Sequence, residues 1–281
     1  MIIRDIATLR QTVRRWKEAG ETTGLVPTMG ALHEGHLSLV KQARKQAARV
    51  IVSIFVNPTQ FNNPTDLATY PRTEEADIAL LGDADAIFIP SVDTMYPAGF
   101  NSRVQVMTMT ETLEGAHRPG HFDGMATVVT KLFGITQADI AFFGEKDWQQ
   151  LQIIRRFVQD LNIPIDIVAC PTLREADGLA MSSRNRRLSP QARAIAPELH
   201  ATLQETAAQL RAGTPVTEAL AQAKARLARS GFQPVDYLAC CEAESLTSIN
   251  DVFATKYDQG SLRLLVAVAL DSVRLIDNIV I

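Results

Sequence analysis

Cysteine is scarce in this chain, which has 3 cysteines among 281 residues. Cys170, Cys240 and Cys241 are odd in number, two of them are adjacent, and none has metal-ligand spacing. The sequence therefore excludes a disulfide-based scaffold and a cysteine-rich zinc module, and we expect buried, reduced thiols. A chain of this length needs neither, because it can bury a sizeable core, and two domains are the first expectation.

Long hydrophobic runs and an excess of charge are also missing. No apolar run approaches the ~20 residues that a membrane-spanning helix needs, and the first 20 residues are amphipathic rather than a signal peptide. Net charge is −3, from 28 basic and 31 acidic side chains, so there is no general attraction to nucleic acid or to an anionic membrane. We expect a cytoplasmic protein that binds small molecules, with neither nucleic acid nor membrane as a partner.

The first 172 residues alternate strand-like and helix-like segments. The strand candidates, residues 23–28, 50–56, 85–90, 139–144 and 164–170, are nearly all apolar, as strands covered by helices on both faces are. Between them, apolar residues recur at helical spacing. The pattern predicts an α/β fold, with a Rossmann-like parallel sheet in a domain of residues 1–172.

Residues 173–281 have a different character and predict a smaller C-terminal lid domain of helices and β-sheet. Ser189-Pro190 is typical of a helix start, and the long alanine-rich helix expected there is bent near its start by Pro197. A second helix is expected from about Pro215 to Gly231. Three strands follow, at residues 235–243, 262–270 and 273–281, and the loop at 250–260 separates the first two.

The stretch LVPTMGALHEGHLSLV, residues 25–40, carries two histidines where a strand meets a helix. Gly30 permits a tight turn, and Gly35 lets a ligand approach the backbone at the helix start, where free N–H groups attract phosphate. His33 and His36 there are able to donate hydrogen bonds to phosphate oxygens. Zinc is a poorer alternative, because a pair of histidines needs a third ligand and none is obvious nearby. Two histidines that are neighbours by chance remain the plainest alternative.

Further segments place polar groups where ligands bind in open α/β sheets. Asn57, Gln60 and Tyr70 lie in and after FVNPTQF, residues 55–61, and their uncharged groups suit a small hydroxy acid. GAHRPGHFDGMATVV, residues 115–129, is a Gly- and His-bearing loop that runs into a helix with Met125, Val128 and Val129, and an ordinary surface loop explains it equally well. GEKDWQQL, residues 144–151, ends a strand and begins a helix, and READGLAMSSRN, residues 174–185, offers two hydroxyls and Arg184 for a triphosphate.

The order His-x-Gly-His after such a strand resembles the signature of the nucleotidyltransferase and class I aminoacyl-tRNA synthetase superfamily. Together, PTMGALHEGH, FVNPTQF, YPRT, GEKDWQQL and READGLAMSSRN resemble the pantothenate synthetase family, the AMP-forming pantoate–β-alanine ligases, over nearly the whole chain. The resemblance implies that pantoate, β-alanine and ATP are the substrates. It implies that the pantoate carboxylate attacks the α-phosphate of ATP to give a pantoyl adenylate and pyrophosphate, and that β-alanine then displaces AMP. It also implies a homodimer.

The resemblance assigns roles to residues of this sequence. The catalytic residues it implies are His36, which takes the proton-donating position, with His33, Lys146 and Arg184. It implies that pantoate and β-alanine contact Gln60, Gln150, Asn57 and Tyr70. The ATP-binding residues it implies are Met29, Gly30, Ala31, Leu32, His33, Glu34, Gly35, His36, Gly144, Glu145, Lys146, Asp147, Leu173, Met181, Ser182, Ser183 and Arg184.

Some points remain open. Leu173 stands where relatives usually carry valine for a backbone contact to adenine, and the contact should survive because the side chain is not the donor. Mg²⁺ is expected with ATP, and Asp77 is a candidate ligand, although Glu74, Glu75 and Asp77 also fit the charged first turn of a helix. The alternatives are another adenylyltransferase of the superfamily, whose phosphate-bearing acceptor would want more basic residues, and a nucleotide-binding regulatory module without turnover.

Overall fold

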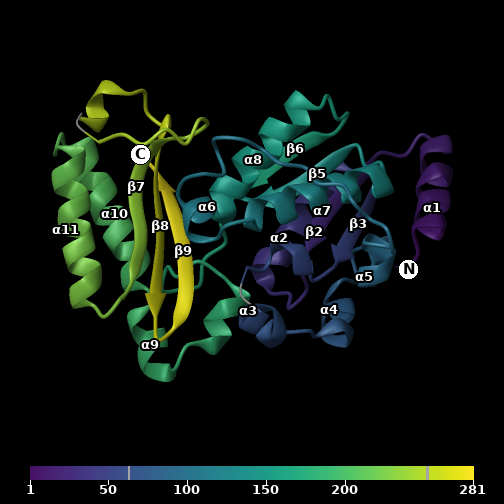
Figure 1. Ribbon diagram of the computed structural model, residues 1–281, viewed down its shortest axis with the longest axis horizontal. Helices are drawn as coiled ribbons and strands as arrows, with labels where there is room; N and C mark the ends of the chain where they lie inside the picture. The colour runs from purple at the N-terminus through teal and green to yellow at the C-terminus, as the bar shows by residue number, and fades with distance from the viewer. Residues whose placement is uncertain (63, 251–252) are drawn as a thin grey trace. The chain divides into compact units, whose positions relative to one another are not determined.

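The computed structural model describes residues 1–62, 64–250 and 253–281, which form two compact units (Figure 1). The first unit contains residues 1–145 and 153–171, and the second contains residues 146–152 and 172–281. The sequence suggested a boundary at residue 172 and gave no sign that residues 146–152 pack with the second unit. Asp251 and Val252, in the loop expected between two C-terminal strands, lie outside the described residues, as does Asn63 of the segment that follows FVNPTQF.

The first unit is built on a six-stranded parallel sheet, which confirms the predicted Rossmann-like fold. Its strands run in the order β1-β4-β3-β2-β5-β6. Because β3 and β5 lie on opposite sides of β2, the order reverses at β2, and crevices that bind ligands form at the carboxyl ends of strands at such a point. The bounds are β1 (Ile2–Ile3), β2 (Thr23–Thr28), β3 (Arg49–Ile54), β4 (Ala86–Phe88), β5 (Ile140–Gly144) and β6 (Asp166–Cys170).

Helices cover this sheet because its strands are apolar on both faces. Val26 of β2 belongs to a buried cluster with Leu39, Val40 and Ala43 of α2. Successive strand residues point to opposite faces, so Leu25 faces the other side, where α7 packs on β2 and on α1. The helices, with two 3₁₀ turns, are α1 (Ile6–Glu18), α2 (Glu34–Gln46), η1 (Pro58–Gln60), α3 (Pro64–Thr69), α4 (Glu74–Leu80), α5 (Val92–Met95), α6 (Glu114–His117), α7 (His121–Thr136), η2 (Glu145–Asp147) and α8 (Trp148–Asp160).

The second unit is a three-stranded antiparallel sheet, β7 (Val235–Glu242), β8 (Leu262–Leu270) and β9 (Val273–Val280), with two long helices against it (Figure 1). These are α10 (Glu198–Arg211) and α11 (Val216–Arg229), and η3 (Ser183–Arg187), α9 (Pro190–Ile195) and η4 (Ala254–Lys256) complete the unit. Ser189 caps α9 as predicted, because its hydroxyl accepts the Ala192 N–H. The single bent helix expected from residue 190 is wrong: Pro197, which has no N–H, separates α9 from α10.

Within the described ranges, none of the helices is both long enough and apolar enough to cross a bilayer.

Candidate active site

The turn after β2 is held in an unusual conformation by a buried carboxylate. Gly30 (φ 79°) and Ala31 (φ 50°) both adopt left-handed backbone, which costs an alanine of the order of 1 kcal/mol. Asp77 of α4, 2 % exposed, accepts the N–H groups of Ala31 at 2.9 Å and Leu32 at 2.8 Å and the Thr73 hydroxyl at 3.2 Å. A Cβ on Gly30 would lie 3.0 Å from Asp77 Oδ2, so glycine is required there. Asp77 therefore fixes the path of the chain into α2.

His33 and His36 lie side by side at the start of α2, with ring centroids 4.1 Å apart, and both are half-buried. His33 is the N-cap of the helix, and its Nδ1 accepts the Gly35 N–H at 3.1 Å. His36 Nδ1 accepts the His33 N–H at 3.3 Å. Since Nδ1 of each ring is an acceptor, each proton sits on Nε2. Two Nε2–H donors at the positive end of a helix dipole suit a phosphate ligand.

Asn57 and Gln60 form a buried polar network at the carboxyl end of β3. Asn57, 1 % exposed, donates through Nδ2 to Gln60 Oε1 at 3.0 Å and to the Gly124 carbonyl at 3.1 Å. Its Oδ1 accepts the hydroxyls of Tyr96 at 2.7 Å and Thr59 at 2.9 Å. Because its amide is used within the protein, the geometry favours Asn57 as a support for Gln60, and its predicted contact with substrate stays a prediction.

Gln60 connects this network to the turn after β2, residues 29–36. Its Nε2 lies 3.0 Å from Met29 Sδ, and its backbone carbonyl lies 2.8 Å from His121 Nδ1. Helix α7 comes close here because Gly124 has no side chain: a Cβ would lie 2.2 Å from the Thr59 carbonyl oxygen. The structure thus brings together two predicted site segments, the turn at residues 29–36 and the loop at residues 57–60.

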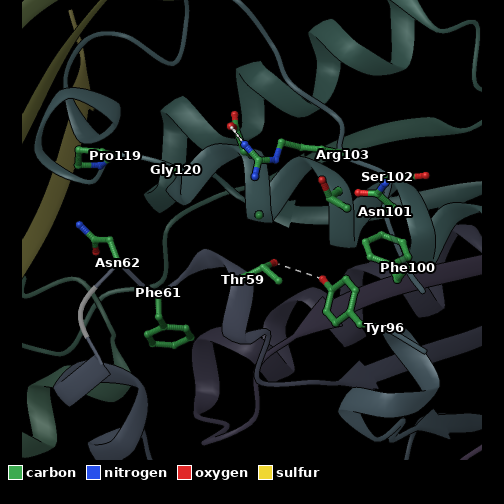
Figure 2. Close-up of a pocket in the computed structure, with 13 residues that line it drawn as sticks. Thr59, Phe61, Asn62, Tyr96, Phe100, Asn101, Ser102, Arg103, Pro119 and Gly120 are labelled. Carbon is green, nitrogen blue, oxygen red and sulfur yellow. Dashed lines mark hydrogen bonds and ion pairs between the residues drawn. The ribbon is translucent and has the colours of Figure 1, made fainter. Parts of the chain in front are cut away.

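A hollow of about 390 Å³ opens beside this network (Figure 2). Figure 2 shows the Thr59 and Tyr96 hydroxyls pointing toward each other across it, at 3.3 Å. Phe100 and Arg103 also line it, and burial raises the pKa of Tyr96 against the opposing effect of the Thr59 hydrogen bond. Tyr70, also predicted as a substrate contact, is 7 % exposed and packs edge-on against Phe61, with ring centroids 5.5 Å apart, and its contact with substrate stays a prediction.

The second unit carries the remaining predicted ATP contacts, apart from Gly144 and Glu145, which end β5 and begin η2 in the first. Lys146 and Gln150 are half-buried and Asp147 is exposed. The Lys146 carbonyl accepts Asn278 Nδ2 at 2.9 Å, which ties the start of α8 to β9.

Residues 173–181 form a small hairpin. Leu173, 39 % exposed, accepts the Met181 N–H at 3.0 Å through its carbonyl, and Arg174 pairs with Ala180. Ser182 then caps η3, because its Oγ accepts the Arg184 N–H at 3.3 Å. The segment from Met181 to Arg184 is thus an ordered part of the second unit, with all four side chains half-buried.

Several supporting residues were missed by the sequence reasoning: Asp277 and Asn278 of β9, and Tyr96, His121 and Gly124 around Gln60. For Asp277 and Asn278 the sequence did offer a signal, the string LIDN inside a largely apolar strand, where a buried aspartate and asparagine are unusual. Burial would raise the pKa of Asp277, but the nearby His200 ring, the hydrogen bonds from Arg174 and the charge of Arg174 hold that pKa below its usual range.

The structure favours no protein cage for Mg²⁺. Among residues 1–62, 64–250 and 253–281, no group of three or more His, Cys, Asp or Glu side chains is arranged to hold a metal ion. Asp77 fits poorly as a direct ligand, since it is buried and accepts two backbone N–H groups and a hydroxyl. Glu74 and Glu75 are exposed in the first turn of α4, as the alternative interpretation expected.

Comparison with known proteins shows the family to which the chain belongs. The family model described as pantoate-beta-alanine ligase matches residues 1–280. The chain is 58 % identical over 280 residues to a pantothenate synthetase of Cereibacter sphaeroides, covering 99 % of this chain and 98 % of that protein. It is 55 % identical over 282 residues to that of Paracoccus denitrificans, covering 100 % and 98 %.

Similar solved structures carry the same family description. The crystal structure of pantothenate synthetase from Thermus thermophilus has a TM-score of 0.91 and 45 % identity, covering 99 % of this chain and 98 % of that one. Pantoate-beta-alanine ligase from Francisella tularensis, complexed with beta-gamma ATP and beta-alanine, has a TM-score of 0.83 and 36 % identity, covering 100 % and 97 %.

The parallel sheet and the histidine-bearing turn at the end of β2 define an α/β protein with a helix start that suits a phosphate ligand. The chain belongs to the pantoate–β-alanine ligase family. This membership confirms the predicted family and enzyme class, and it favours neither of the alternatives.

Proposed function

We propose that this protein joins pantoate to β-alanine at the expense of ATP, through a pantoyl adenylate. A carboxylate oxygen of pantoate attacks the α-phosphorus of ATP and pyrophosphate leaves. The β-alanine amine then attacks the acyl carbon and loses a proton, and AMP leaves. A carboxylate does not react with an amine until one of its oxygens becomes a good leaving group, which is what adenylation supplies.

The observation that carries the proposal is the pair of imidazoles at the start of α2. Both rings accept a backbone N–H on Nδ1, so the direction of each Nε2–H is set by the fold before ATP binds. Donors fixed in place before the reaction stabilise negative charge that develops in the transition state. We assign His33 and His36 to the ATP phosphates, with residues 29–36 forming one part of the ATP site.

The other roles follow from charge and hydrogen-bonding capacity. Lys146 and Arg184 carry the positive charge, and Ser182 and Ser183 the hydroxyls, that suit the remaining phosphate oxygens. Gln60 and Gln150 hold the hydroxyl and carboxylate of pantoate, with Gln60 also near β-alanine. Mg²⁺ would enter as part of the ATP substrate and would neutralise charge on its phosphates. Residues 173–281 act as a lid domain, and the working form is a cytoplasmic homodimer.

A pyrophosphate-release assay tests the proposed reaction. With ATP and pantoate alone, we expect about one pyrophosphate per site, and with β-alanine added, continuous formation of AMP. A related adenylyltransferase would release pyrophosphate only with its own nucleotide-like acceptor. A regulatory module would release none. Either of these two results would reject the proposal.

Gln60→Ala and Gln150→Ala should each weaken pantoate binding about tenfold or more while changing ATP binding by less than threefold. A buried polar group that loses its partner costs about 1–3 kcal/mol, and a tenfold change corresponds to about 1.4 kcal/mol. Calorimetric titration with each ligand measures both effects. Gln159→Ala, an exposed position of the same helix α8, is the matched control. Equal losses for the two ligands would contradict the division of roles.

A further inference from the structure

Two consecutive residues of β9 contact two segments that lie far away in the sequence. Asp277 and Asn278 are 3 % and 5 % exposed, and both belong to the second unit together with their partners. Asp277 binds Arg174, which begins the 174–185 segment, and Asn278 binds the backbone of Lys146. Both segments carry proposed ATP contacts, so one point of the sheet supports two parts of the proposed ATP site.

The contact with Lys146 is fixed in orientation. Asn278 donates through Nδ2 to the Lys146 carbonyl at 2.9 Å, and its Oδ1 accepts Arg263 Nη1, so the amide cannot flip without losing both bonds. The Arg263 guanidinium lies 3.3 Å from the ring centroid of Trp148. Trp148 in turn donates through Nε1 to the Ala243 carbonyl at 2.7 Å. The start of α8 is therefore attached to the sheet on both sides of Asp147.

The contact with the 174–185 segment is a bidentate ion pair. Arg174 donates from Nη1 to Asp277 Oδ2 at 2.7 Å and from Nη2 to Oδ1 at 2.9 Å. The same guanidinium donates to the Gly178 carbonyl at 3.1 Å, which spans the hairpin, and to the Asn278 carbonyl at 3.4 Å. His200 Nδ1 lies 3.6 Å from Asp277 Oδ2 on the far side. The hairpin is thereby tied to the strand that holds Lys146.

A buried ion pair is a poor way to gain stability, because removing two charges from water offsets much of their attraction, and apolar residues of similar volume often serve as well. The bidentate guanidinium of Arg174 and the side-chain amide of Asn278 instead fix orientation, because each of their hydrogen bonds forms in one geometry only. That property matters where flanking residues must meet a ligand in a fixed arrangement, since small displacements at a reacting centre are costly.

We propose that Asp277 and Asn278 are positioning residues for the adenylation step, which hold Lys146 and the Ser182–Arg184 segment in a fixed arrangement relative to each other. This inference rests on the proposed function, because it needs those side chains to bind ATP. In this proposal neither Asp277 nor Asn278 contacts a substrate. They act through Arg174 on one segment and through the Lys146 carbonyl and Trp148 on the other.

Loss of the Asp277–Arg174 contact and loss of the Asn278–Lys146 contact should change the KM values differently. Arg174→Met acts mainly on the hairpin and removes one long bond to the Asn278 carbonyl, so we expect KM for ATP to rise about tenfold and KM for pantoate to stay within twofold. Asn278→Ala loosens η2, which carries Lys146, and the start of α8, which carries Gln150, so KM should rise at least fivefold for both substrates. Arg174→Lys keeps the charge but loses the fork, and should recover part of the loss. Initial rates of pyrophosphate formation at varied ATP and pantoate measure all three variants.

Arg274→Met is the matched control, because Arg274 also lies on β9 and pairs with Asp236 of β7 at 2.7 Å. It should lower the melting temperature and leave both KM values within twofold. The inference is overturned if Arg174→Met and Asn278→Ala lower the melting temperature while their KM values match the control. Should Arg174→Met not fold, Arg174→Lys decides by the same criterion.

The failure of the inference is distinct from the failure of the proposed site. If Lys146→Ala and Arg184→Ala lose activity while Arg174→Met and Asn278→Ala keep it, only the inference is wrong. If Lys146→Ala and Arg184→Ala themselves leave KM for ATP and kcat unchanged, the proposed ATP contacts are wrong, and the inference falls with them.

Discussion

Replacing His36 by alanine should lower the single-turnover rate of pyrophosphate formation from ATP and pantoate by about 10²–10³-fold. Removing one pre-positioned donor to a developing negative charge typically costs ~2.7–4 kcal/mol. His36 Nδ1 is engaged with the His33 N–H, so its Nε2–H is fixed in direction before ATP binds. Rapid-quench measurement of pyrophosphate at saturating ATP and pantoate gives the rate of this step directly.

His36 also caps α2, so a loss of activity in the alanine variant has a second source. A lost cap costs about 0.5–2 kcal/mol of stability. His36→Asn separates the two effects, because its side-chain oxygen is able to accept the His33 N–H while the Nε2–H donor is gone. We expect it to melt close to wild type and to lose nearly as much rate as His36→Ala. His117→Ala, an exposed histidine at the end of α6, is the control. A rate for His36→Asn within a few-fold of wild type would reject the assignment.

The strands that the sequence predicted best are those buried on both faces. The nearly continuous apolar run at residues 23–28 is β2 as the structure has it, because helices cover both of its sides. The strand β1, only Ile2–Ile3, was missed since two residues carry no periodicity. The break between α9 and α10 was missed for a different reason: Pro197 signals a disturbance, but sequence alone does not separate a bend from a stop.

The candidate site was predictable where its chemistry lies in one contiguous motif. Residues 29–36 form a turn and a helix start, whose geometry follows from local glycines and histidines. The supports of that site were not predictable. Asp77 is 46 residues from Ala31 in sequence, and Asp277 is 103 residues from Arg174. A polar contact at such separations leaves no periodic signal, so only the folded chain reveals it.

The second large effect is expected at Asp77. Replacing it by alanine leaves the N–H groups of Ala31 and Leu32 unpaired in a buried turn. Each unpaired group costs about 1–3 kcal/mol, so the free energy of unfolding should fall by roughly 2–6 kcal/mol. Asp77→Asn is nearly isosteric but keeps only one acceptor oxygen, and its amide N–H groups face a backbone donor. We expect urea unfolding to give intermediate destabilisation for it.

Activity distinguishes a carboxylate that shapes the turn from one that holds Mg²⁺. If Asp77 acts by keeping Gly30 and Ala31 left-handed, Asp77→Asn should lower the adenylation rate at least tenfold, because both histidines follow directly from that turn. The Mg²⁺ concentration at half-maximal rate should then equal that of wild type. If Asp77 is a metal ligand, that concentration must rise and excess Mg²⁺ must restore the rate. Glu75→Gln, an exposed acid in the same helical turn, controls for the loss of one negative charge near the site. If excess Mg²⁺ restores the adenylation rate of Asp77→Asn and does not change that of Glu75→Gln, the altered turn is not the cause of the lower rate.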